Sequence, residues 1–148
     1  MSDSDLIKLY SGRILALAAD MPRTGRLEGA DAEVRKRAPL CGSTVTVGLT
    51  LRDGKVADYA QDVKACALGQ ASASVVGGAI VGCTVDQVRT ARDQLEAMLK
   101  QGGPVPDAPF DGLEVLIPAR DFKNRHASIL LALTASVEAI DAALAGTA

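Results

Sequence analysis

The sequence predicts an α+β fold, in which one helix precedes a small antiparallel sheet and a helical C-terminal half covers one face of that sheet. Two patterns support this prediction. Residues 44–63 alternate apolar and polar side chains around an Asp53-Gly54 pair, which is typical of a tight β-hairpin. Residues 67–145 instead repeat apolar side chains at helical spacing.

The first half of the chain supplies the first helix and the strands. Apolar residues recur near helical spacing in 4–19, and Pro22 and Gly25 then end that helix. Residues 33–37 are strongly polar, so we expect them to form at most an edge strand. The hairpin strands are expected at 44–51 and 56–63. The following apolar side chains share one face of the first of them: Val45, Val47, Leu49 and Leu51.

The second half of the chain reads as helical. Residues 67–82 are rich in small side chains, which let a helix lie close to a sheet. Residues 84–100 begin with a Thr-x-x-Gln capping box and carry an apolar stripe. After a loop rich in Gly and Pro, we expect a short helix over 112–118 and a last helix over 125–145. The following side chains of the last helix should face inward: Ile129, Leu130, Leu133, Val137, Ile140 and Leu144.

Length and composition narrow the class of protein. A chain of 148 residues fits a single domain, 1–148, with a core that needs no disulfide or metal. The net charge of −2 and the small number of aromatic residues argue against a nucleic-acid partner. No secretory signal is evident, and the apolar stretch 71–83 is shorter than the ~18 residues that a membrane span needs. We therefore expect a cytoplasmic protein without membrane contact.

Three cysteines and a single histidine are the candidates for chemistry. The cysteines are odd in number and lack Cys-x-x-Cys spacing, which argues against a disulfide framework and a zinc ribbon. Cys66 directly precedes a predicted helix, where free N–H groups favour the thiolate form. If Cys41, Cys66 and His126 converge, they would form a soft three-ligand site for zinc or an iron–sulfur cluster. The alternative is that each cysteine is a small buried hydrophobe, which we expect of Cys83.

Several short motifs also follow one another along nearly the whole chain. They are Leu9-Tyr10 with Ile14-Leu15, the Pro22 to Leu27 turn, Ala38-Pro39-Leu40-Cys41-Gly42, the Asp53-Gly54 hairpin, Ala65-Cys66-Ala67 followed by Ala71-Ser72-Ala73-Ser74, Gly82-x-Thr84, and His126-Ala127-Ser128-Ile129-Leu130. In this order they resemble the NifU/IscU/SufU type of iron–sulfur cluster assembly scaffold.

The resemblance implies an IscU/SufE-like fold with an antiparallel three-stranded sheet. It implies a scaffold or carrier rather than an enzyme, which binds iron or a labile [2Fe-2S] cluster and passes it to apo-proteins. A cysteine desulfurase and the recipient proteins would be its partners. Three cysteines are the family's ligands, helped by an Asp after the first Cys-Gly and, in one branch, by the His before the third cysteine.

The chain departs from this pattern at two places. Ser43 stands at the place of the Asp, and Ala127 stands at the place of the third cysteine. The expected ligands are therefore Cys41, Cys66 and His126, since imidazole can replace thiolate on iron. The lost carboxylate and thiolate should lower the affinity for a divalent metal. De novo assembly is in question, because the third cysteine is a favoured sulfur acceptor in the family's cluster-building branch.

Three functions therefore stay open at the level of the sequence. One is a scaffold or carrier that uses the three ligands, with a homodimer as one arrangement. Another is a divergent, cluster-free paralogue that acts as a protein-interaction module. The third is a zinc-held protein that relays a persulfide through Cys66.

Overall fold

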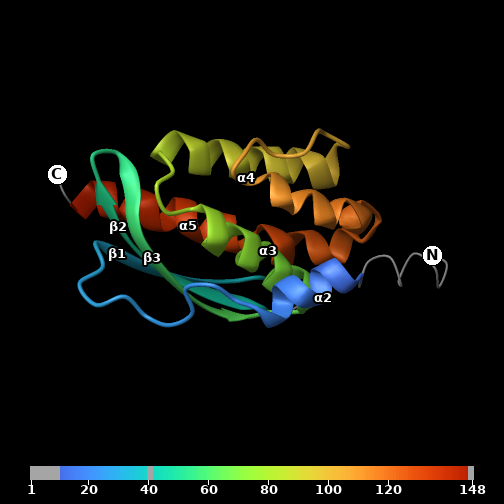
Figure 1. The fold of residues 1–148 in the computed structure, drawn as a ribbon, viewed down its shortest axis with the longest axis horizontal. Helices are drawn as coiled ribbons and strands as arrows, with labels where there is room; N and C mark the ends of the chain where they lie inside the picture. The colour runs from blue at the N-terminus through green and yellow to red at the C-terminus, as the bar shows by residue number, and fades with distance from the viewer. Residues whose placement is uncertain (1–10, 40–41, 147–148) are drawn as a thin grey trace.

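An antiparallel three-stranded sheet, ordered β1-β2-β3, forms one layer of the protein, and helices cover one of its faces (Figure 1). The computed structural model describes residues 11–39 and 42–146. Its strands and helices are α2 (Gly12–Ala19), β1 (Ala32–Arg37), β2 (Thr44–Arg52), β3 (Lys55–Lys64), α3 (Ala67–Ala79), α4 (Val85–Lys100), η1 (Asp111–Asp121), η2 (Lys123–Arg125) and α5 (His126–Gly146). The α+β fold with a three-stranded sheet is thereby confirmed.

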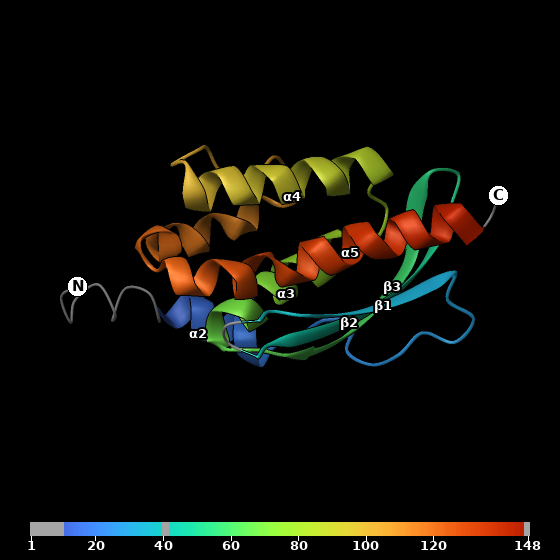
Figure 2. The same cartoon turned by 180° about the vertical axis from the view of Figure 1, so that it is seen from behind.

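The helices form two further layers above the sheet. Helix α5 packs on β1 and β2, and α3 packs on β3 beside it. Helix α4 packs on the other side of α5, so that α5 lies between α4 and the sheet (Figure 2). This central position explains why α5 is apolar on nearly all sides. The segment Lys123–Gly146 is long and apolar enough to span a membrane, but 56% of its most apolar window is buried within the fold.

The alternation predicted for β2 is present in the sheet. Val45, Val47 and Leu49 are at most 1% exposed and face the helices, whereas Thr44 and Thr46 lie on the opposite face. The following residue of the pattern, Leu51, is partly exposed because the pairing with β3 shifts between Thr50 and Leu51.

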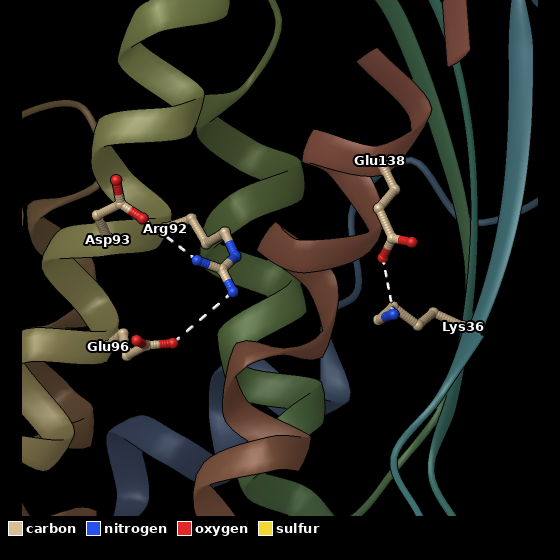
Figure 3. Close-up of polar contacts among 5 residues, drawn as sticks. All are labelled: Lys36, Arg92, Asp93, Glu96 and Glu138. Carbon is tan, nitrogen blue, oxygen red and sulfur yellow. Dashed lines mark hydrogen bonds and ion pairs between the residues drawn. The ribbon is translucent and has the colours of Figure 1, made fainter. Parts of the chain in front are cut away.

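The edge strand β1 forms in spite of its polar sequence. All six of its residues pair with β2, from Ala32 opposite Leu49 to Arg37 opposite Thr44. Its inward-facing Lys36 extends to the surface of α5, where Nζ lies 2.8 Å from Oε2 of Glu138 (Figure 3). Long side chains of this kind cover apolar surface with their methylene groups and keep the charge in water.

The hairpin turn and the helix cap that the sequence predicts are both present in the structure. Asp53 and Gly54 have φ angles of 54° and 76°, as a two-residue hairpin with both central residues at positive φ requires. Thr84 and Gln87 form the predicted capping box at the start of α4, with N···O distances of 3.1 and 2.8 Å.

Four element boundaries or faces differ from the prediction. A helix begins at Gly12, because the Ser11 hydroxyl accepts the Ile14 N–H as an N-cap; residues 4–10 lie outside the described part. Helix α3 ends at Ala79 rather than at residue 82, and the short helix over 112–118 is a longer 3₁₀ segment. Leu144, expected to face inward, lies in the last turn of α5 and is 43% exposed.

A candidate thiol site

Cys66 occupies the junction between β3 and α3. It is the N-cap residue of α3 and has an extended backbone (φ −66°, ψ 168°), and its side chain does not bond to the first turn of the helix. The residue is half-buried. It lines a shallow hollow together with Gly42, Ser43, Val63, Lys64, Ala65 and Gln70. The thiol is therefore held by regular structure on both sides and open to a partner or ligand.

Two buried hydroxyl groups lie beneath this thiol. The Ser128 Oγ atom, in the first turn of α5, is 3.5 Å from the Cys66 Sγ atom and 3.1 Å from the Ser43 Oγ atom. Ser43 is 4% exposed and Ser128 is 1% exposed. The contacts bring the segment before β2, the start of α3 and the start of α5 to one point. Since a hydroxyl both donates and accepts, Ser128 can donate to sulfur when the thiol is deprotonated or bound.

Small residues in α3 allow this close approach. A Cβ atom on Gly69 would lie 2.4 Å from the Ser128 Oγ atom and 2.9 Å from the Ala65 Cβ atom. One turn further along α3, the Ser72 hydroxyl donates to the Ile129 carbonyl at 2.6 Å. The glycine and serine thus hold α3 against α5 at the level of the thiol.

The other predicted thiol, Cys41, lies outside the described residues. The two residues that follow it, Gly42 and Ser43, line the same hollow as Cys66. Two backbone hydrogen bonds join them to Ala38: the Ala38 N–H donates to the Ser43 carbonyl at 2.8 Å, and the Gly42 N–H donates to the Ala38 carbonyl at 3.0 Å. Gly42 has a φ of 71°, a conformation that favours glycine.

His126 is the first residue of α5, but its ring contacts backbone carbonyl oxygens of η1. The ring Nε2 atom lies 3.0 Å from the Ala119 carbonyl oxygen and 3.1 Å from that of Arg120. Carbonyl oxygens only accept, so Nε2 carries the hydrogen and the lone pair of the neutral ring is on Nδ1. His126 lines a separate hollow beside Leu99, Lys100, Arg120 and Lys123. It is not among the residues that line the Cys66 hollow.

The remaining cysteine, Cys83, lies apart from this site. It is 3% exposed, and its Sγ atom donates to the Ala79 carbonyl at 3.2 Å. Burial raises the pKa of the Cys83 thiol, which disfavours the reactive thiolate. Its position as a small buried hydrophobe agrees with the sequence-based expectation.

Ser128 is the residue that sequence reasoning missed. It belongs to the His126-Ala127-Ser128-Ile129-Leu130 string, one of the motifs that resemble the family, but nothing in the string indicates contact with Cys66. Within the described residues, no group of three or more His, Cys, Asp or Glu side chains could hold a metal ion. A ligand set of that kind therefore needs a residue outside the described part, such as Cys41, or a second chain.

The structure is thus a small α+β domain with a half-buried thiol where the three-stranded sheet meets its covering helices. Residues 9–119, which make up most of the chain, match the family model of the NifU-like N terminal domain. The protein belongs to this family, and the resemblance drawn from the motifs is confirmed.

Two individual relatives are similar to this chain over nearly their whole length. The crystal structure of a nitrogen-fixing NifU-like protein (N-terminal) from Brucella abortus is 45% identical and has a TM-score of 0.93, covering 95% of this chain and 98% of that one. The iron–sulfur cluster assembly scaffold protein IscU of Thermotoga maritima is 25% identical over 89% of this chain and 92% of its own length.

A more distant structure shares the fold. It is a candidate iron–sulfur cluster assembly scaffold protein for the SUF system from Fervidobacterium islandicum AW-1, with 22% identity and a TM-score of 0.79. It covers 89% of this chain and 96% of its own.

Proposed function

We propose that the protein is an iron–sulfur scaffold or carrier, which holds iron or a labile [2Fe-2S] cluster as cargo and passes it to apo-proteins. The observation that supports this most directly is the half-buried Cys66 thiol, set in a hollow lined also by the two residues after Cys41. The scaffold role named for the Thermotoga maritima relative supports the same function.

Cys41 and Cys66 supply thiolates to the cargo in this proposal, because thiolate is the ligand that suits iron in sulfur clusters. His126 is the proposed third ligand and would coordinate through Nδ1, since Nε2 donates to backbone carbonyls. Ser43 and Ala127 add no charged ligand. Fewer thiolates and carboxylates leave the cargo less tightly held, as transfer requires.

The proposal extends to the cellular setting. A cysteine desulfurase would supply the sulfur, and apo-proteins would receive the cluster; the chain itself would act as a scaffold and not as an enzyme. It would work in the cytoplasm as the single domain 1–148, and a homodimer could complete the coordination of the irons. The relatives' names refer to iron and sulfur and not to zinc, so zinc has no part in the proposal.

A second candidate is a cluster-free interaction module. The position of the His126 ring favours it, because the ring faces backbone carbonyls and lines a different hollow from Cys66. In that case the thiol hollow would contact the assembly proteins without holding metal.

Anaerobic reconstitution with iron, sulfide and reductant distinguishes these functions. The wild-type protein should gain a visible chromophore and bound iron. Cys41→Ser and Cys66→Ser should abolish both, and His126→Ala should reduce both. The matched control is Cys83→Ser, which should leave both unchanged because Cys83 is buried away from the hollow. No chromophore and no iron in the wild type would support the interaction module, and equal loss in the Cys66 and Cys83 variants would refute the site.

A further inference from the structure

The sheet carries a row of cations on the face opposite the helices, beginning at the end where Cys66 lies. The register places Arg37, Thr44 and Lys64 opposite one another across the three strands at that end. The next outward-facing row, two residues along each strand, is Arg35, Thr46 and Asp62. The charged side chains of both rows are exposed.

The charge on this face is not compensated within the described part of the chain. There, Arg35, Arg37 and Lys64 make no ion pair, whereas the neighbouring Arg26 pairs with Glu33. The nearby carboxylate of Glu33 raises the pKa of Arg26, and that pair adds no net charge. Within these two rows, three unpaired cations and Asp62 give a net charge of +2, in a chain whose formal charge is −2.

The cationic face continues into the thiol hollow. Lys64 lines the hollow on the outer face of the sheet, with Arg26, Glu33, Arg35, Thr44, Thr46 and Asp62, and it also lines the Cys66 hollow. On the opposite edge, the Arg37 Nη2 atom lies 3.7 Å from the position of a Cβ atom on Gly42, another residue of the Cys66 hollow. A partner that lies on the cations therefore reaches the thiol.

The shape of the face favours an extended acidic polypeptide as the occupant. Arg35 and Arg37 are two residues apart on one strand, a separation of ~6.6 Å. An extended segment repeats its side chains at the same interval, so that alternate Asp or Glu residues can meet both guanidinium groups. The residues of the two rows include no aromatic side chain on which a nucleobase could stack.

We propose that Arg35, Arg37 and Lys64 form a docking surface for an acidic, extended segment of the protein that exchanges sulfur or cluster with Cys66. The inference rests on the proposed function, since that function requires such a partner. The docking surface would guide the partner's reactive group to the thiol and raise the rate of encounter.

A disulfide-exchange assay tests this surface without any cluster. The protein carries Cys41→Ser and Cys83→Ser, so that Cys66 is its only cysteine. Two peptides of equal length each carry one cysteine as a mixed disulfide with thionitrobenzoate; one peptide alternates Asp with Ser, and the other alternates Gln with Ser. The Cys66 thiolate attacks the peptide sulfur, a protein–peptide disulfide forms, and coloured thionitrobenzoate leaves with the electron pair. No external oxidant is needed.

The readout is the ratio of the two rates, in which the intrinsic reactivity of the thiol cancels. At low salt the acidic peptide should react on the order of 10-fold faster, and the advantage should vanish at high salt. The triple variant Arg35→Gln, Arg37→Gln, Lys64→Gln should bring the ratio to about one. The matched control Arg13→Gln, Arg89→Gln, Arg92→Gln changes the net charge equally on other elements and should keep most of the advantage.

Three outcomes of the rate measurements would overturn the docking surface. They are equal rates for the two peptides on the unmodified face, an advantage that survives in the triple variant, and an equal loss in the control variant. A competition arm adds oligothymidylate or phosphatidylglycerol vesicles at a concentration of negative charge below that of the peptide itself. If either abolishes the rate advantage of the acidic peptide, that result overturns the docking surface in favour of a nucleic acid or a lipid. Failure of reconstitution would refute the proposed function and leave these rates intact, so the two failures are distinguishable.

Discussion

At the scale of single residues, two adjacent glycines of α3 have opposite surroundings. A Cβ atom on Gly77 would lie 2.4 Å from the Gln61 Nε2 atom and 3.3 Å from the Pro22 carbonyl oxygen. That amide is itself fixed, because it donates to the carbonyls of Pro22 and Ala73. Beyond the neighbouring backbone of its own helix, Gly78 has no heavy atom within 4 Å of the same position. The close approach of the chain at Gly77 thus depends on the missing side chain.

We expect Gly77→Ala to lower the free energy of unfolding by about 1–3 kcal/mol through overpacking. Gly78→Ala, its control one residue away, should raise it by about 0.5–1 kcal/mol because alanine is the better helix former. Urea unfolding followed by circular dichroism measures both values. A stabilising Gly77→Ala would contradict the packing described here.

At the scale of elements, the capping box of α4 is the clearest case of a local signal that determines a boundary. Thr84→Ala removes the hydroxyl that accepts the Gln87 N–H, so the free energy of unfolding should fall by about 0.5–2 kcal/mol. Thr90→Ala is the control, since Thr90 is exposed within the same helix and alanine is favoured there. A thermal melt of the three proteins decides; equal melting temperatures for wild type and Thr84→Ala would contradict the role of the cap.

Signals carried by a few neighbouring residues explain which elements could be predicted from the sequence. The positive-φ pair at Asp53 and Gly54, the alternation in β2 and the capping box each act within a single element. The face of Leu144 and the 3₁₀ form of η1 depend on which helices lie beside them, and the sequence pattern carries no such information. Ser11 shows a third case, because a hydroxyl inside an apolar periodic stretch started a helix there.

The features of the candidate site also divide into those that a local sequence pattern predicts and those that depend on how the helices pack. The position of Cys66 before a helix follows from local pattern, and so does the burial expected of Cys83 between two helices. The contact between Cys66 and Ser128 joins residues far apart in the chain and depends on how α3 lies on α5. For the same reason, the carbonyl partners of His126 could not be predicted, because they belong to η1, whose 3₁₀ form and position depend on tertiary packing.

Ion pairs at the surface contribute little to the stability with which the elements pack together. Arg92 pairs with Asp93 and Glu96 within α4, and Lys36 pairs with Glu138 across to α5 (Figure 3). Their side chains are between 32% and 77% exposed, so water and salt screen the attraction. The packing of α5 between the sheet and α4 holds these elements together.

At the scale of the whole molecule, stability should fall on the alkaline side. Burial raises the pKa of Tyr59 above its ordinary value of 10.0 and that of Cys83 above its ordinary value of 9.0. Both groups then stay protonated in the folded state while the unfolded chain loses its protons. The contribution of Cys83 is complete below about pH 9 and that of Tyr59 below about pH 10; each declines from there until the pH has risen through the raised pKa of the folded group.

Urea unfolding between pH 7 and 11 tests this dependence. The free energy of unfolding should decline by up to about 1.4 kcal/mol per pH unit for each group above its unfolded pKa. Tyr59→Phe should be less stable at pH 7, because it loses the bond to Ser136, but flatter above pH 10. Cys83→Ala should remove the decline that begins near pH 9. An unchanged slope in both variants would exclude these groups as its cause.

Native mass spectrometry after anaerobic reconstitution shows whether the protein holds a cluster, because it counts the iron and sulfur held by the intact protein. The wild-type protein and Cys83→Ser should carry two irons and two sulfides per cluster, and Cys66→Ser should carry none. An unloaded wild-type protein, or one that gains sulfur without iron, would contradict the scaffold function.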